Sequence, residues 1–154
     1  MFKKILIIIV VTVVGLLVFS YFNFNESIPA TAQSPAKNEN TLSINDVQIN
    51  IEIADDPSEQ AQGLSGREYL AQDSGMLFVF PQPTTPAFWM KDMKFSLDFI
   101  WIDEGGEIIE ITKSVSPATY PKTFMPPSPV KYVLEVNSGW TEKNGVKVGD
   151  KIEF

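Results

Sequence analysis

The stretch TLSINDVQINIEIA, residues 41–54, decides the class of fold. Two β-type runs, Thr41–Ile44 and Val47–Ile53, flank the pair Asn45-Asp46, which favours a tight turn. In the second run every other residue is Val or Ile, and the residues between them are Gln, Asn and Glu. Since successive side chains of a strand point to opposite faces, this alternation predicts a hairpin with one buried face and one wet face.

A short helix is predicted directly after this hairpin. Asp56 has the position of an N-cap, Pro57 suits the first helical turn, and Glu59 suits the acidic position of a capping box. Gly63 is the expected end of the helix, because glycine is common just past a helix C-terminus.

Short apolar runs bounded by Gly or Pro continue to the end of the chain. They predict strands at Met76–Phe80, Ala87–Met90, Leu97–Asp103, Glu107–Thr112, Lys131–Asn137 and Val146–Phe154. Gly105-Gly106 joins two of them as a tight hairpin. Many short strands are typical of sandwiches and barrels rather than of alternating parallel folds. We therefore predict a mainly β fold, a small sandwich or partly closed barrel of short, mostly antiparallel strands with one short helix.

The segment Ser114–Pro129 is the longest predicted loop. Four prolines lie within Pro121–Pro129, and proline cannot donate the backbone hydrogen bond that a central strand requires. Loops of this length in a small domain are more often functional than short ones. We therefore expect this segment to form the wall or lid of a site.

Residues 1–22 predict an export segment. Lys3 and Lys4 precede an uncharged, largely apolar run over residues 5–22. As a helix this run spans about 27 Å, close to the roughly 30 Å of hydrocarbon in a bilayer. The positive-inside bias keeps the two lysines in the cytoplasm and places the rest of the chain outside. The membrane is thus the expected partner of residues 5–22.

The export segment has two interpretations, a signal anchor and a signal peptide. Ala30-Thr31-Ala32 has the small-x-small form of a signal peptidase site, so cleavage near Ala32 would secrete the domain. The apolar run exceeds the roughly 7–15 residues of a usual signal peptide core, which favours an uncleaved anchor in the cell envelope. Residues 23–40 are rich in Asn, Ser, Ala and Pro and predict a disordered linker, which leaves residues 41–154 as a single domain.

The composition argues against several functions. The 154 residues include 12 basic and 19 acidic ones, so a nucleic-acid partner, which needs a concentrated basic surface, is disfavoured. Cys and His are both absent. This excludes disulfides, cysteine nucleophiles and Ser-His-Asp triads, and it removes the usual ligands of zinc and iron. We therefore predict no metal and no cofactor.

Five blocks of sequence occur in the order in which a known family has them. They are Gly63-Leu64-Ser65-Gly66-Arg67, Gly75-Met76-Leu77-Phe78-Val79-Phe80, Phe88-Trp89-Met90-Lys91, Leu97-Asp98-Phe99-Ile100-Trp101-Ile102-Asp103, and Val133-Leu134-Glu135-Val136-Asn137-Ser138-Gly139 with Val148-Gly149-Asp150. On these blocks the region 41–154 resembles the family known as domain of unknown function 192. The resemblance implies a small, mainly β domain, often behind an export segment, without an established activity. Where relatives have Asn, Thr and Pro after the third block, this chain has Asp92, Met93 and Ser96.

The charged residues of these blocks, with Trp89, are the candidate site residues. Arg67 is the only arginine of the chain, which indicates a position where a planar fork of donors matters. Asp98 and Glu135 each lie between apolar residues of a predicted strand. One interpretation is that Arg67 pairs with Asp98 or Glu135 and ties its loop to the sheet. The other is that Arg67 and Lys91 bind an anionic ligand near those carboxylates.

Three functions are compatible with this pattern. We favour an extracytoplasmic, non-enzymatic binding or accessory module of the cell envelope, with a pocket around Arg67, Lys91, Trp89 and the loop 114–129 for a small anionic, glycan or peptide ligand. The first alternative is an extracytoplasmic hydrolase in which Asp98 and Glu135, facing one cleft, act as general acid and base. The second is a structural, membrane-tethered scaffold without a concave site.

Overall fold

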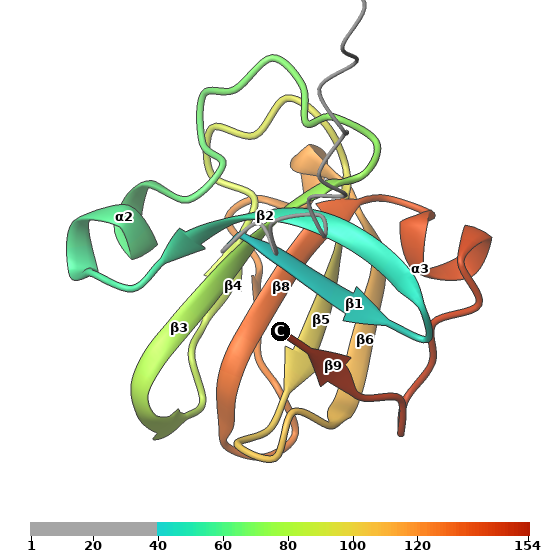
Figure 1. The fold of residues 1–154 in the computed structure, drawn as a ribbon. Coiled ribbons are helices and arrows are strands. Elements are labelled where there is room, and N and C mark those ends of the chain that lie inside the picture. Colours follow the sequence, from blue (N-terminus) through green and yellow to red (C-terminus); the bar gives the residue numbers. More distant parts are fainter. Residues whose placement is uncertain (1–39) are drawn as a thin grey trace, which may run out of the picture. The chain divides into compact units, whose positions relative to one another are not determined.

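A computed structural model of the protein describes residues 40–154 (Figure 1). The predicted export segment 1–22 lies outside the described residues, as does the predicted linker 23–40 apart from Asn40. Within residues 40–154, no helix has both the length and the apolar character needed to cross a membrane.

Short strands make up most of the regular structure of the described residues. The strands are β1 (Thr41–Ile44), β2 (Val47–Ala54), β3 (Ser74–Thr84), β4 (Phe88–Trp89), β5 (Leu97–Ile102), β6 (Ile108–Val115), β7 (Thr123–Phe124), β8 (Val130–Asn137) and β9 (Ile152–Glu153). The helical elements are α2 (Pro57–Gln62), the 3-10 turn η1 (Pro117–Thr119) and α3 (Trp140–Lys143).

Seven strands form one curled sheet in the order β6-β5-β8-β3-β2-β1-β9, visible in Figure 1. Neighbouring strands are antiparallel, except that β2 and β3 are parallel and are connected through α2. The two ends of the sheet meet at a bridge between Glu107 and Lys151, beside a 2.8 Å hydrogen bond from the Ile108 N–H to the Asp150 carbonyl. The predicted class, a partly closed barrel of mostly antiparallel strands, is confirmed.

The hairpin of β1 and β2 forms as its sequence predicts. Asn45 and Asp46 have φ angles of 50° and 65°, the positive values that a two-residue turn of this kind needs. Val47, Ile49 and Ile51 of β2 point to the inside of the curl, where Ile49 and Ile51 are buried. The predicted alternation ends there, since Ile53 is 40% exposed.

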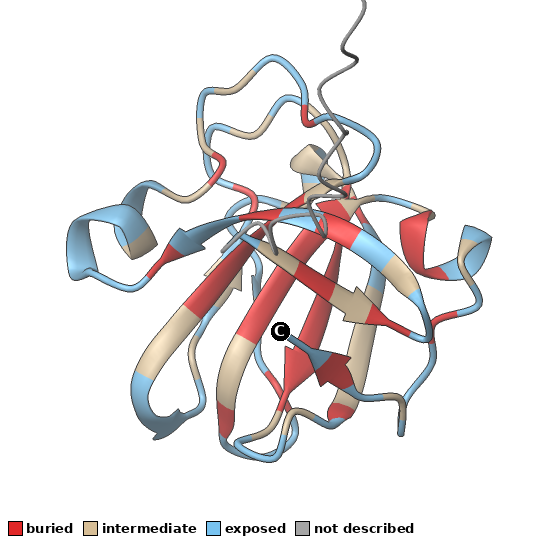
Figure 2. Ribbon diagram, viewed as in Figure 1, coloured by how far each residue is buried: buried red, intermediate tan, exposed pale blue. Residues whose placement is uncertain are grey.

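The buried residues of the main sheet form two apolar cores, one on each face. Figure 2 shows how these buried residues are distributed along the strands. The inner core fills the curl and joins side chains such as Leu77, Ile100 and Leu134 to those of β1 and β9. The outer core lies on the opposite face, around Phe99 and Trp101. Strand β5 meets both cores and all its residues are buried, which explains why its sequence is an almost unbroken apolar run.

The outer core is completed by the chain that follows α2, through Leu64 and Leu70, by β4 and the chain after it, and by β7. Strands β4 and β7 pair as a small second sheet. The predicted helix is confirmed, since the Asp56 side chain accepts hydrogen bonds from the N–H groups of Ser58 and Glu59 at 2.7 and 2.9 Å. Gly63 ends α2 with a φ of 50°, a value that favours glycine.

The proline-rich segment contributes one short strand to the outer core. Strand β7 pairs only with β4, so the segment forms no central strand, as its prolines predict. The ring of Phe124 in β7 contacts that of Phe99 on the main sheet, with 5.9 Å between centroids. The segment is therefore packed on the outer core.

The C-terminal region differs from the prediction. The predicted strand Val146–Phe154 is mostly irregular, because Gly145 and Gly149 take left-handed φ angles of 68° and 91° and only β9 joins the sheet. Helix α3 was not predicted. It follows Gly139, whose φ of 82° turns the chain so that Trp140 packs into the inner core.

Candidate functional site

The two candidate carboxyl groups lie on neighbouring strands but on opposite faces of the main sheet. In the pairing of β5 with β8, Asp98 faces Val136 and Glu135 faces Phe99. Directly paired residues share a face and successive residues alternate, so Asp98 points into the inner core and Glu135 points outward. The predicted cleft with both carboxyl groups is therefore wrong, since the sheet separates them.

Asp98 is a buried carboxylate whose hydrogen-bonding capacity is used inside the protein. Its Oδ1 accepts from the Ser114 N–H at 2.8 Å. Its Oδ2 accepts from the Gly139 N–H at 3.1 Å and from the N–H and hydroxyl of Thr141 at 3.3 and 2.7 Å. These bonds tie the end of β6 and the start of α3 to β5, so the role of Asp98 is structural.

Glu135 is buried without such partners. Its residue is only 5% exposed, and its neighbours across the sheet on the same face are Met76 and Phe99. No hydrogen-bond donor or cation of residues 40–154 contacts its carboxyl group. Burial alone raises the pKa of Glu135 to about 8, because charging the group without a partner is costly. At neutral pH the group is therefore mostly a neutral carboxylic acid.

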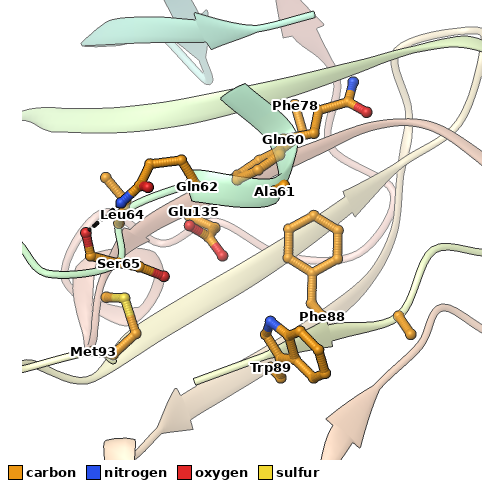
Figure 3. Close-up of a pocket in the computed structure, with 12 residues that line it drawn as sticks. Gln60, Ala61, Gln62, Leu64, Ser65, Phe78, Phe88, Trp89, Met93 and Glu135 are labelled. Carbon is orange, nitrogen blue, oxygen red and sulfur yellow. Dashed lines mark hydrogen bonds between the residues drawn. The ribbon is translucent and has the colours of Figure 1, made fainter. Parts of the chain in front are cut away.

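The Glu135 carboxyl group faces a small pocket on the outer face, between α2 and β4. Figure 3 shows it between the rings of Phe88 and Trp89 on one side and Ser65 and Met93 on the other. The free volume of the pocket is about 70 Å³. This is well below the roughly 300–1,000 Å³ of pockets that enclose a drug-sized ligand, so the pocket has room for one chemical group.

Three other polar side chains of the pocket donate hydrogen bonds to backbone carbonyl groups. Gln60 donates its amide N–H to Ala54 and Val79 at 3.3 and 2.9 Å, Gln62 donates to Ser65 at 2.9 Å, and the Ser65 hydroxyl donates to Lys91 at 2.9 Å. Each of these three side chains keeps an oxygen that can accept hydrogen bonds, and Gln62 also keeps its second amide N–H.

Arg67 forms its ion pair with Glu52 of β2. Its Nη1 and Nη2 atoms lie 2.5 and 2.7 Å from the two carboxylate oxygens, the bidentate geometry that a planar fork allows. This contact lowers the pKa of Glu52 and raises that of Arg67. The predicted pairing with Asp98 or Glu135 is wrong. Glu52 was not identified from the sequence as the partner of Arg67. Its position on the solvent-exposed face of the alternating run is the signal that could have indicated this pairing.

The predicted site residues are only partly brought together. Trp89 is 50% exposed and lines the pocket of Glu135. Its ring packs against that of Tyr120 from the proline-rich segment, with 6.1 Å between the ring centroids. Arg67 lines a separate cleft with Glu52, and Lys91 is exposed. The pocket thus joins Trp89 to Glu135 and has neither cation among its lining residues.

The described residues therefore define a small curled-sheet domain with an aromatic pocket around one unpaired carboxyl group. The chain belongs to the family of domain of unknown function 192 (DUF192), described as "Uncharacterized ACR", whose family model matches residues 40–154. Four of the five sequence blocks quoted above meet at the pocket, through Ser65, Phe78, Trp89 and Glu135. Met93, which departs from the family pattern, lines it as well.

Two solved structures resemble this fold. A protein of Sinorhizobium meliloti 1021 with a proposed role in transcription regulation is 37% identical, with a TM-score of 0.66 over 69% of this chain and 81% of its own. A protein of unknown function from Novosphingobium aromaticivorans DSM 12444 is 28% identical, with a TM-score of 0.70 over 74% of this chain and 84% of its own. Among curated proteins, none is significantly similar to the chain.

Proposed function

We propose that the domain is a non-enzymatic binding module that takes one group of a ligand into the pocket at Glu135. The observation that carries this proposal is the unpaired carboxyl group, 5% exposed, at an aromatic pocket. Among residues 40–154, no side-chain nitrogen or oxygen that is closed off from the surface lacks a hydrogen-bond partner, so the unpartnered oxygens of Glu135 are open to the pocket. A group bound in the pocket can therefore hydrogen-bond to them, in an environment where hydrogen bonds are stronger than in water.

The lining of the pocket favours a peptide among the expected ligands. An anion is disfavoured, because no Lys or Arg of residues 40–154 lines the pocket and Arg67 is neutralised by Glu52. A cavity of about 150 Å³ is known to admit benzene, and the pocket has about half of that volume. A sugar ring is therefore too large for the pocket itself, whereas the end of a slim peptide side chain fits.

The location of the module follows from the sequence. The apolar run of residues 5–22 behind Lys3 and Lys4 supports a membrane-anchored domain outside the cytoplasm, with secretion if the chain is cleaved near Ala32. Fractionation of cells that express a C-terminally tagged chain tests this. An anchored domain stays with the membranes and is degraded by protease added from outside, whereas degradation only after lysis would contradict the location.

Other functions have less support. Transcription regulation, proposed for the S. meliloti relative, is not carried to this chain, because 19 acidic against 12 basic residues suit DNA poorly. The two-carboxylate hydrolase lacks its geometry, since Asp98 and Glu135 face opposite cores. A scaffold without a concave site does not account for the pocket.

Binding at the pocket is tested by nuclear magnetic resonance of the full chain in detergent micelles. The methyl group of Met93 and the indole N–H of Trp89 both report on the pocket. We expect members of a library of cationic, neutral and anionic fragments to shift both signals, and Glu135→Gln to abolish these shifts. Glu104→Gln, the same change in the exposed hairpin, serves as the control. If no fragment shifts either signal in the wild type, the proposed function is wrong.

A further inference from the structure

The pocket of Glu135 presents mainly hydrogen-bond acceptors to whatever fills it. Both amide N–H groups of Gln60, one of the two of Gln62 and the Ser65 hydroxyl are bound to backbone carbonyl groups, and all three side chains keep an oxygen that can accept. Glu135 adds two carboxyl oxygens without a partner among residues 40–154. A ligand with several N–H donors complements this set, and an ammonium group has three donors and no acceptor.

The aromatic walls of the pocket suit a positive charge as well. The rings of Phe78 and Phe88 pack edge to face with 4.8 Å between centroids, and Trp89 forms a further wall. The negative faces of such rings attract cations, and tryptophan does so most strongly.

The volume of the pocket limits the size of the cationic group that it can hold. About 70 Å³ is too little for a ring, but enough for a charged group at the end of an unbranched chain. A bulky guanidinium or a quaternary ammonium group fits less well than a primary amine for the same reason.

We infer that the pocket at Glu135 binds a primary ammonium group on an unbranched alkyl stem, with its N–H donors on Glu135 and its charge between the rings of Phe88 and Trp89. This inference rests on the proposed function and names the class of its ligand. A lysine side chain and a free alkylamine share this chemistry.

One feature of the pocket favours a competing ligand. The indole N–H of Trp89 has no partner among residues 40–154, and a protonated Glu135 is itself a donor. A neutral carbonyl ligand would use both donors. The charge of the ligand therefore decides between the two modes, and the probes share a four-carbon skeleton and differ in the charge and hydrogen-bonding groups of the head group.

The experiment compares three four-carbon probes on the full chain in micelles: n-butylammonium, n-butanol and n-butyrate. Shifts of the Met93 methyl and Trp89 indole signals are followed for the wild type, Glu135→Gln and the control Glu104→Gln. We expect n-butylammonium to bind about tenfold or more tightly than the other two, and Glu135→Gln to weaken its binding by about tenfold or more. Glu104→Gln leaves the affinity unchanged.

The outcomes separate the two proposals. If n-butanol or n-butyrate binds as tightly as n-butylammonium, or if only other fragments bind, the ammonium inference is wrong and the pocket remains a binding site. If neither these probes nor the fragment library shifts either signal, both proposals are wrong. A Glu135→Gln variant that binds n-butylammonium as the wild type does also overturns the inference.

Calorimetry gives an independent readout of the charged mode. Glu135 is the only titratable side chain among the lining residues, and it is mostly protonated at pH 7. A cation stabilises the carboxylate, so binding of n-butylammonium at pH 7 releases about one proton, seen as a heat that changes with the ionisation enthalpy of the buffer. Binding without proton release contradicts the inference. Nα-acetyl-lysine methylamide, titrated in parallel, shows whether a lysine side chain or only a free alkylamine is accepted.

Discussion

Asp98 and Glu135 are buried carboxyl groups on adjacent strands, and they differ in their hydrogen bonding. Asp98 faces the inner core and accepts four hydrogen bonds from β6, α3 and the turn before α3. Glu135 faces the outer core and has no partner among residues 40–154. One residue of offset in the pairing of β5 with β8 places them on different faces.

The comparison of Asp98 with Glu135 shows that a buried acidic side chain can have either a structural or a functional role. A carboxylate whose lone pairs are all used holds the fold together, whereas one that faces an open pocket without a partner is a candidate for function. Four substitutions or conditions test this distinction, and they follow in order of the expected change in the free energy of unfolding.

The largest effect is expected from Asp98→Leu. The substitution leaves the N–H groups of Ser114, Gly139 and Thr141 and the Thr141 hydroxyl without their acceptor, and each unsatisfied buried donor costs about 1–3 kcal/mol. We expect the free energy of unfolding to fall by about 4 kcal/mol or more, measured by urea denaturation. A loss below about 1 kcal/mol would mean that these bonds do not hold the barrel together.

The second effect is a dependence of stability on pH. An unfolded Glu135 loses its proton near pH 4.5, but the folded protein keeps it to about pH 8, so the folded state binds more protons in between. Stability therefore falls as pH rises across this window, by up to about 1.4 kcal/mol per pH unit. Between pH 6 and pH 8 we expect the wild type to lose about 2 kcal/mol relative to Glu135→Gln. Parallel pH profiles of the two proteins would show that Glu135 is not an unpaired buried acid.

The third effect has the opposite sign to the first. Glu135→Leu removes an unpaired polar group from an apolar face, so we expect it to raise the free energy of unfolding at pH 7 by about 1 kcal/mol. It is the direct counterpart of Asp98→Leu, since both replace a buried carboxyl group on neighbouring strands. Equal destabilisation by the two substitutions in urea denaturation would remove the distinction between them.

The smallest effect is expected at the exposed carboxylate Glu52. Its side chain is 55% exposed and that of Arg67 is 36% exposed, and ion pairs of this kind contribute about 0.2–1 kcal/mol. Arg67→Lys loses the bidentate geometry and should lower stability by about 0.5 kcal/mol, less at high salt. A double-mutant cycle with Glu52→Gln isolates the pair, and a coupling near zero would show that it contributes nothing.

Much of the fold was predictable because it depends on local patterns. The alternation in β2 as far as Ile51, the turn residues Asn45 and Asp46, and the cap of α2 at Asp56 act within a few residues, and the structure has all three. The stretch Val146–Phe154 was mispredicted, because glycine φ angles and packing on the inner core override its β-type composition.

The candidate site was predictable only as a set of residue types. Trp89 and Glu135 were both among the predicted site residues, and the structure brings them together at one pocket. The ion pair of Arg67 was assigned to the wrong partner, because the choice among Glu52, Asp98 and Glu135 depends on which strands lie under the loop after α2. Sequence spacing contains no information on that contact.

The sequence by itself determined the β-rich class of this domain, the short helix and the acidic charge, and its prediction of an export segment at residues 1–22 concerns residues outside the described ones. Each of these follows from periodicity, turn chemistry or composition, which are properties of neighbouring residues. The tertiary structure alone decided that Asp98 is satisfied and Glu135 is not. Strand register assigns each side chain to a face, and a shift of one residue would exchange the two.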